Sequence, residues 1–304
     1  MSKKIWISGS RGYVGSYLVP YLRQSGYEVK GISNSKSNDS SIITTDFSDR
    51  SQIKELLEEH GAPETFIHLG WKNVYEVNDE SHIGSNVSNS INLIDELYDF
   101  GTKRIMVVGT VSEYGGKEGA LRENENDEEP ENNYVRGKLS VAKYGLKAAS
   151  ELDCVYIHIR LFNTYGSGQS NNSLINQLFA NSLTNEPMNL SPCTQYRDYI
   201  HVSEAIEGIE RLSSVTQSGV VNLGSGSFIK LKDFVKLFWK ELGADPSRLV
   251  FGAHEIPSYE QNQPKQFSDQ TKIESLIGWS PKLSIKEGVK LTVQQWKNNT
   301  DARF

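Results

Sequence analysis

A glycine-rich stretch near the start of the chain constrains the fold more than any other feature. It reads Ile5-Trp6-Ile7-Ser8-Gly9-Ser10-Arg11-Gly12-Tyr13-Val14-Gly15 and is followed by apolar residues at helical spacing. The pattern predicts a strand, a tight turn and a helix. Glycine lets the backbone approach a ligand where a Cβ would clash, and the N–H groups of a new helix attract anions. The G-x-x-G-x-x-G spacing therefore indicates a diphosphate cradle over residues 9–15, while a plain glycine turn explains it equally well.

The alternation of strand and helix continues through the first half of the chain. Strand-like segments at 26–32, 65–70 and 104–108 alternate with helical segments at 51–60 and 83–100. Such alternation predicts an α/β fold with a Rossmann-type, doubly wound parallel sheet that binds ligands at the carboxyl ends of its strands. A chain of 304 residues is also long enough for a second, smaller lobe that shares a cleft with the first.

Composition limits the class of ligand and the location. With 32 Lys+Arg against 38 Asp+Glu the net charge is −6, which argues against a nucleic-acid partner and leaves any phosphate to local cations. No apolar run approaches membrane-spanning length, and Met1-Ser2-Lys3-Lys4 leads directly into a strand. We therefore expect a cytoplasmic protein without a membrane partner. Two cysteines, Cys154 and Cys193, indicate neither a disulfide framework nor a metal site.

The end of the second predicted strand bears on which dinucleotide could bind. In dinucleotide folds an acidic residue at this place holds the ribose 2′-hydroxyl of NAD, whereas cations accept the 2′-phosphate of NADP. Here Ser33 stands at that position, Lys36 follows, and Arg11 lies in the glycine loop. This pattern favours NADP(H) over NAD(H), with NAD(H) as the alternative. Alternatively, both cations are solvated surface charges.

Two further strand ends are candidate cofactor contacts. Asp46 and Phe47 follow a short strand, where a carboxylate and an apolar ring could meet an adenine edge. Leu69 and Gly70 are the last residues of an apolar strand of the buried type, and both are expected to contact the cofactor. We interpret His68, just before them, as a hydrogen-bonded histidine, because no partners at metal-ligand spacing accompany it.

A tyrosine and a lysine four residues apart mark a third candidate site. Tyr134 and Lys138 begin a predicted helix and lie on one of its faces. This spacing alone is common. It gains weight from a hydroxyl-bearing loop after a strand, at Thr110, and from the glycine loop at the N-terminus.

Together these pieces resemble the extended short-chain dehydrogenase/reductase family, the NAD(P)-dependent epimerases, dehydratases and reductases of nucleotide sugars. The resemblance spans nearly the whole chain. Besides the residues above, it rests on four later blocks: Arg160-Leu161-Phe162-Asn163-Thr164-Tyr165-Gly166, Arg197-Asp198-Tyr199-Ile200-His201-Val202, Asn222-Leu223-Gly224-Ser225-Gly226 and Leu276-Ile277-Gly278-Trp279-Ser280-Pro281.

The resemblance implies a division into two lobes. An NAD(P)-binding Rossmann domain is expected over 1–165, with 197–226 partly returning to it. A smaller C-terminal α/β lobe over 166–304 is expected to bind mainly the substrate, a nucleotide-diphospho-sugar. Asn163 and Arg197 match residues that hold its diphosphate in relatives. Many relatives dimerise through two long helices, here 83–100 and 134–150, so a homodimer is expected.

The chemistry of the catalytic candidates follows from their side chains. A phenol has a pKa of about 10, and a nearby ammonium and oxidised nicotinamide favour its phenolate. Tyr134 is thereby suited to exchange a proton with the substrate, while Lys138 also holds the nicotinamide ribose. Thr110 would donate a hydrogen bond to the substrate oxygen whose charge changes during hydride transfer.

Three observations bear on the position of this chain within the family. A similar 4,6-dehydratase carries an Asp-Glu pair just after the catalytic threonine, where this chain has Val111 and Ser112, and this difference argues against a dehydratase. Ser112 is expected to bind the substrate. Relatives often have a second pyrophosphate arginine in the loop at 256–265, which has none here, and Lys265 is the substitute. Arg11 is similar to the loop arginine of NADPH-using reductases.

From these features we expect NADPH-dependent reduction of the 4-keto group of a nucleotide-diphospho-4-keto-6-deoxy or dideoxy sugar, for surface-polysaccharide precursors. The alternative is an NAD-dependent nucleotide-sugar 4-epimerase. A non-catalytic NADP-binding regulator is a further alternative, but it would not need Thr110, Tyr134 and Lys138 together.

Overall fold

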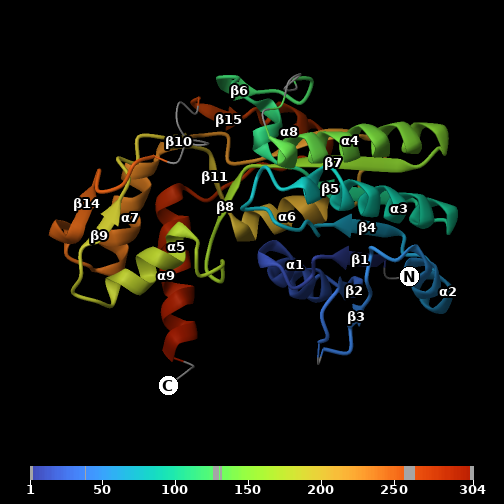
Figure 1. Cartoon of the computed structure of the whole chain (residues 1–304), viewed down its shortest axis with the longest axis horizontal. Coiled ribbons are helices and arrows are strands. Elements are labelled where there is room, and N and C mark those ends of the chain that lie inside the picture. Colours follow the sequence, from blue (N-terminus) through green and yellow to red (C-terminus); the bar gives the residue numbers. More distant parts are fainter. Residues whose placement is uncertain (1–2, 38, 126–129, 131, 257–263, 302–304) are drawn as a thin grey trace.

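The computed structural model describes residues 3–37, 39–125, 130, 132–256 and 264–301 (Figure 1). Its centre is a seven-stranded sheet in the order β3-β2-β1-β4-β5-β7-β12, and every pairing in it is parallel. The strands are β1 (Lys4–Ser8), β2 (Glu28–Ser33), β3 (Ile42–Thr44), β4 (Thr65–His68), β5 (Arg104–Val108), β7 (Val155–Leu161) and β12 (Gly219–Leu223). The predicted doubly wound parallel sheet is confirmed.

Helices cover both faces of this sheet because its central strands are apolar on both sides. In β1, Ile5 and Ile7 belong to the core beneath α1 and α6, whereas Trp6 belongs to the opposite core beneath α2, α3 and α4. The helices of the first face are α1 (Tyr13–Gln24), α6 (Val202–Leu212) and α8 (Thr271–Ile277). Those of the second are α2 (Arg50–His60), α3 (Ser85–Asp99) and α4 (Asn133–Glu151).

The C-terminal half builds a smaller lobe at one side of the sheet (Figure 1). Its core is formed by α5 (Leu174–Ser182), α7 (Leu231–Leu242) and α9 (Ile285–Asp301), with β9 (Met188–Leu190) paired to β14 (Leu249–Phe251). The chain does not stay in this lobe, since β12 pairs with β7 in the main sheet and α6 packs on α1. The predicted smaller C-terminal lobe is therefore present.

Short two-stranded ladders connect the lobe to the ends of the main strands. They pair β8 (Asn163–Tyr165) with β11 (Tyr199–His201), β10 (Tyr196–Arg197) with β13 (Ile229–Lys230), and β15 (Gln266–Ser268) with β6 (Gly119–Leu121). The described residues also form 3₁₀ turns at Glu80–His82, Val111–Tyr114 and Pro246–Arg248. In the described part of the chain, no helix has the length and apolar character needed to cross a membrane.

Candidate active site

The glycine loop between β1 and α1 has the close packing that a backbone cradle requires. A Cβ added at Gly15 would lie 2.3 Å from the Gly9 carbonyl oxygen. A Cβ added at Gly9 would lie 2.8 Å from the Gly70 backbone nitrogen, and the φ of +67° at Gly9 also favours glycine. Gly12 caps α1 without any side-chain hydrogen bond. The first turn of α1 is thus open to an anion, and these residues fit a dinucleotide diphosphate.

Arg11 ties the glycine loop to the loop after β2. Its Nη1 donates to Ser35 Oγ at 2.7 Å and to the Lys36 carbonyl at 3.0 Å. Ser33, at the end of β2, lies 3.1 Å from Ser35 between their hydroxyl oxygens. The end of β2 therefore presents hydroxyl groups and a guanidinium, with the exposed Lys36 beside them, in place of a carboxylate.

The remaining cofactor candidates lie around the same edge of the sheet. Leu69 donates its backbone N–H to Ser8, and Gly70 packs against Gly9. Asp46 is exposed after β3, and its neighbour Phe47 is partly buried with its ring 6.2 Å from that of Phe66. Apart from Lys138 in α4, the residues predicted to contact the cofactor thus lie at the ends of β1, β2, β3 and β4 or in the segments that directly follow them.

His68 has the structural role expected from its sequence context. Its Nδ1 lies 2.6 Å from Ser8 Oγ, and its Nε2 lies 3.1 Å from Ser90 Oγ. Burial, followed by the charge of Lys138, lowers the pKa of this histidine to about 3, so the ring is neutral. No described residues group three or more His, Cys, Asp or Glu side chains as a metal site would require.

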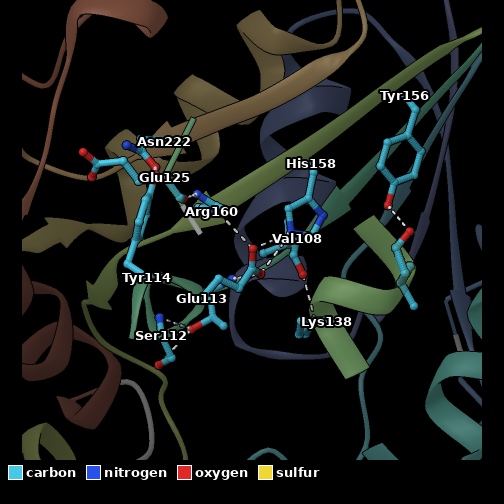
Figure 2. Close-up of polar contacts among 12 residues, drawn as sticks. Val108, Ser112, Glu113, Tyr114, Glu125, Lys138, Tyr156, His158, Arg160 and Asn222 are labelled. Carbon is cyan, nitrogen blue, oxygen red and sulfur yellow. Dashed lines mark hydrogen bonds and ion pairs between the residues drawn. The ribbon is translucent and has the colours of Figure 1, made fainter. Parts of the chain in front are cut away.

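Tyr134 and Lys138 lie in the first turns of α4, which Asn132 caps by accepting the Val135 N–H. Lys138 Nζ donates to the Val108 carbonyl at 2.8 Å, so α4 is tied to the end of β5 (Figure 2). Thr110 follows that strand and is separated from it by Gly109. A hydrogen bond from the Thr110 side chain to the Tyr134 phenol oxygen favours the phenolate form of Tyr134. The structure thus brings the three predicted catalytic residues to one place.

An aromatic wall that the sequence did not reveal encloses this pair. Lys138 Nζ lies 4.0 Å from the centroid of the Trp71 ring, a cation–π distance. Trp71 donates its indole N–H to His82 Nδ1 at 2.9 Å and stacks on that ring. The His82 ring lies 5.3 Å from the Tyr134 ring. Only the folded segment after β4 brings these side chains to α4.

Burial shifts the proton affinities of both acid–base candidates. For Tyr134, burial and then the charge of Glu113 raise the pKa to about 12, against the opposing effect of Thr110. For Lys138, burial lowers the pKa to about 7, and Glu113 opposes this change. A lysine with such a pKa exchanges protons near neutrality, which is typical of functional sites.

Glu113, in the turn that follows Thr110, forms a buried polar cluster with His158 and Arg160 (Figure 2). Both carboxylate oxygens of Glu113 lie 3.0 Å from His158 Nε2, and Arg160 Nε donates to one of them at 2.9 Å. Sequence reasoning missed this cluster. The available signal was the pair His158 and Arg160, two residues apart in an otherwise apolar strand and so on one sheet face.

The predicted substrate residues lie near one another at the start of the C-terminal lobe. Asn163 Nδ2 donates to the Asp198 carbonyl at 3.1 Å, which places it beside Arg197. Lys265 Nζ lies 4.7 Å from the ring centroid of Tyr196, the other neighbour of Arg197. Residues 257–263 of the preceding loop lie outside the described residues.

Ser112 lies on the same side of its turn as Thr110. Its hydroxyl oxygen accepts from Thr110 Oγ1 at 3.4 Å, and its side chain is exposed. By contrast, Glu113 of the same turn has no exposed surface. The turn therefore directs two hydroxyl groups outward and its carboxylate inward.

This chain is similar over nearly its whole length to several known proteins. UDP-glucuronate 4-epimerase of Thermodesulfobacterium geofontis is 22% identical over 327 residues, covering 97% of this chain and 96% of that protein. dTDP-6-deoxy-L-talose 4-dehydrogenase (NAD(P)(+)) of Kitasatospora kifunensis is 24% identical, with 94% and 93% covered. The solved UDP-glucose 4-epimerase of Thermotoga maritima, which contains UDP-glucose, matches with a TM-score of 0.84 and 22% identity, covering 97% and 99%.

A protein-family model also matches most of the chain. It describes the NAD dependent epimerase/dehydratase family and matches residues 5–224, from β1 to the residue after β12. This region contains the glycine cradle, Thr110, Tyr134 and Lys138. The chain therefore belongs to the NAD dependent epimerase/dehydratase family.

Proposed function

We propose that this protein oxidises and reduces C4 of a nucleotide-diphospho-sugar, and that its net reaction is 4-epimerisation. The observation that carries the redox chemistry is the meeting of Thr110, Tyr134 and Lys138 at the end of β5. A nicotinamide cofactor, held by the cradle at Gly9–Gly15, would supply the hydride acceptor and donor.

The chain's own residues would handle the proton at the C4 oxygen. Tyr134 takes this proton when the alcohol is oxidised and returns it when the ketone is reduced. Thr110 donates a hydrogen bond to the same oxygen, and Lys138 places its ammonium next to the phenol ring, 5.9 Å from its centroid. Asn163 and Arg197 would hold the diphosphate at the mouth of the smaller lobe.

Relatives support the epimerase outcome. Two of the three compared proteins are named as 4-epimerases, and both align with nearly the whole of this chain. An epimerase oxidises and re-reduces one carbon, so it needs only one acid–base residue if the sugar ring turns within the site. The site described above offers that residue in Tyr134.

A second candidate is an NADPH-dependent 4-ketoreductase, and the loop after β2 favours it. Arg11, Ser33 and Ser35 form a connected group where a carboxylate would bind an unphosphorylated ribose. A phosphate would find a guanidinium and hydroxyl groups there. The Kitasatospora relative, a dehydrogenase whose name includes NAD(P)(+), agrees with this choice of cofactor.

Two further points belong to the proposal. We also propose that residues 1–165 form the cofactor domain, together with β12 and α6, and that residues 166–304 form a mainly substrate-binding lobe. A homodimer through α3 and α4 is a further part of the proposal, and size-exclusion chromatography with light scattering tests it.

One experiment separates the two candidates. The purified protein is incubated with UDP-glucose or UDP-glucuronate and NAD, and separately with NADPH and a dTDP-4-keto-6-deoxy sugar. Isomer formation without net change in nicotinamide absorbance supports the epimerase, whereas stoichiometric NADPH oxidation supports the reductase. Failure of both reactions in protein that binds NAD(P)H contradicts the proposed C4 chemistry.

A further inference from the structure

Glu113 is a fully buried carboxylate that touches the catalytic loop from behind. It is 0% exposed and lies in the 3₁₀ turn that follows Thr110. One of its oxygens accepts the backbone N–H of Thr110 at 2.9 Å, which closes a capping box around the turn. The position of the Thr110 backbone is therefore fixed by this side chain.

The packing around this contact is tight. A Cβ at Gly109 would lie 2.3 Å from Glu113 Oε1 and 2.3 Å from His158 Nε2, so the loop backbone rests directly on the two groups. The other end of the turn is anchored by Tyr114, whose hydroxyl donates to Asn222 Oδ1 at 2.6 Å (Figure 2). Small movements of the carboxylate would move Thr110.

Two neighbours on β7 keep the carboxylate ionised in a site without solvent. Burial alone raises the pKa of Glu113, but the charges and hydrogen bonds of His158 and Arg160, with the Thr110 N–H, outweigh it and lower the pKa to about 2. Arg160 is itself held by the Glu125 carbonyl at 2.7 Å and by the ring of Tyr114. A fixed negative charge thus remains behind the loop.

This charge acts on the catalytic pair. It raises the pKa of Tyr134 and also that of Lys138, although burial is the larger cause for each. The titratable or charged groups around it are Tyr156, His158 and Arg160 from β7 and Tyr134 and Lys138 from α4.

We propose that Glu113 is a positioning residue, which holds Thr110 against the substrate oxygen and whose buried negative charge favours the ammonium form of Lys138. This inference rests on the proposed roles of Thr110, Tyr134 and Lys138. Glu113 itself touches neither substrate nor cofactor, because its carboxylate is enclosed by protein.

Two substitutions separate its reach from its charge. Glu113→Gln keeps the length of the side chain and an oxygen for the Thr110 N–H, but it removes the charge. Glu113→Asp keeps the charge, but it is one methylene too short for the 2.9 Å contact with that N–H. Circular dichroism and NAD(P)H binding at one pH verify that each variant is folded.

The first readout is the pH dependence of NAD(P)H binding to the protein alone. The alkaline limb of this profile is the loss of binding as the pH rises. We expect it to move to lower pH by roughly one pH unit in Glu113→Gln, because removal of the Glu113 charge lowers the pKa of Lys138. In Glu113→Asp the limb should stay at the wild-type pH. The second readout is turnover, where we expect kcat of Glu113→Asp to fall at least about tenfold with KM changed by less than about threefold.

A second pair of variants addresses the case in which the Glu113 variants do not fold. His158→Leu removes the donor to Glu113, whereas His158→Gln can present an amide N–H at a similar place. We expect kcat to fall at least about threefold in His158→Leu and to recover in His158→Gln.

Two results would overturn the proposal. One is a binding limb at the same pH in wild type and folded Glu113→Gln, and the other is wild-type kcat in both folded Glu113→Asp and His158→Leu. If wild type turns over no sugar, the proposed function fails, but the binding limb still decides the effect of the Glu113 charge.

Discussion

Acid should weaken this protein partly through Glu113, because the pKa of this carboxyl group is lower in the folded protein than in the unfolded chain. The folded pKa is about 2 and the ordinary value is 4.5, so the difference corresponds to about 3 kcal/mol of stability above the unfolded pKa. A carboxyl group with a lowered folded pKa loses this contribution as the pH falls through the folded value. This stabilisation is therefore lost between about pH 4.5 and about pH 2. At about pH 3, about 2 kcal/mol of it has been lost.

Comparison with Glu113→Gln isolates this contribution from those of the other carboxylates. The free energy of unfolding is measured by urea titration of wild type and variant at about pH 6 and about pH 3. We expect the difference between them to shrink by about 2 kcal/mol at the lower pH. Glu55→Gln, on the exposed side of α2, is the control and should leave a constant difference. A constant difference for Glu113→Gln would refute the assignment of an ionised, stabilised carboxylate.

Three further substitutions test the cofactor and catalytic residues. Tyr134→Phe should lower kcat by about 10²–10⁴ while NAD(P)H affinity stays unchanged, and retained turnover would exclude its acid–base role. If the second candidate function holds, Arg11→Ala should weaken NADPH about tenfold or more in titrations and NADH much less, with Arg23→Ala, paired to Asp39, as the control; equal losses would reject the 2′-phosphate contact. Gly15→Ala should cost about 1–3 kcal/mol in thermal or urea unfolding and impair cofactor binding, because its Cβ would lie 2.3 Å from a carbonyl oxygen, whereas Gly116→Ala has open space; wild-type affinity in Gly15→Ala would contradict the cradle.

The sheet could be predicted because its information is local. Each strand and helix has its own apolar periodicity, and the glycine turn marks where the first pair meets. In β1, alternate residues enter opposite cores, as a strand covered on both faces requires. Parallel pairing then follows from the alternation of strands with helices, without knowledge of any single contact.

The side-chain network around the catalytic loop could not be predicted in the same way. Glu113 and Arg160 are 47 residues apart, and their pairing depends on the register of β7 beside β5. Trp71 reaches Lys138 only through an irregular segment whose path has no periodic pattern. Similarly, the sequence predicted that Arg11 contacts a dinucleotide, but it could not show that its guanidinium donates a hydrogen bond to the Lys36 carbonyl in the loop after β2.

The direction of each side chain in the turn after β5 connects this network to the reaction. A dehydratase needs an acid and a base beyond the tyrosine, and the resemblance places them at the two residues after the threonine. Here those residues are Val111 and Ser112, and the carboxylate comes one residue later. The shift by one residue matters because, in a 3₁₀ turn with three residues per turn, Glu113 points into the core while Ser112 remains exposed. In the core, Glu113 is bound by His158 and Arg160 and cannot approach a sugar. In the proposed mechanism, the carboxylate of Glu113 therefore fixes Thr110 instead of serving an elimination, and Tyr134 exchanges the proton of a reversible oxidation.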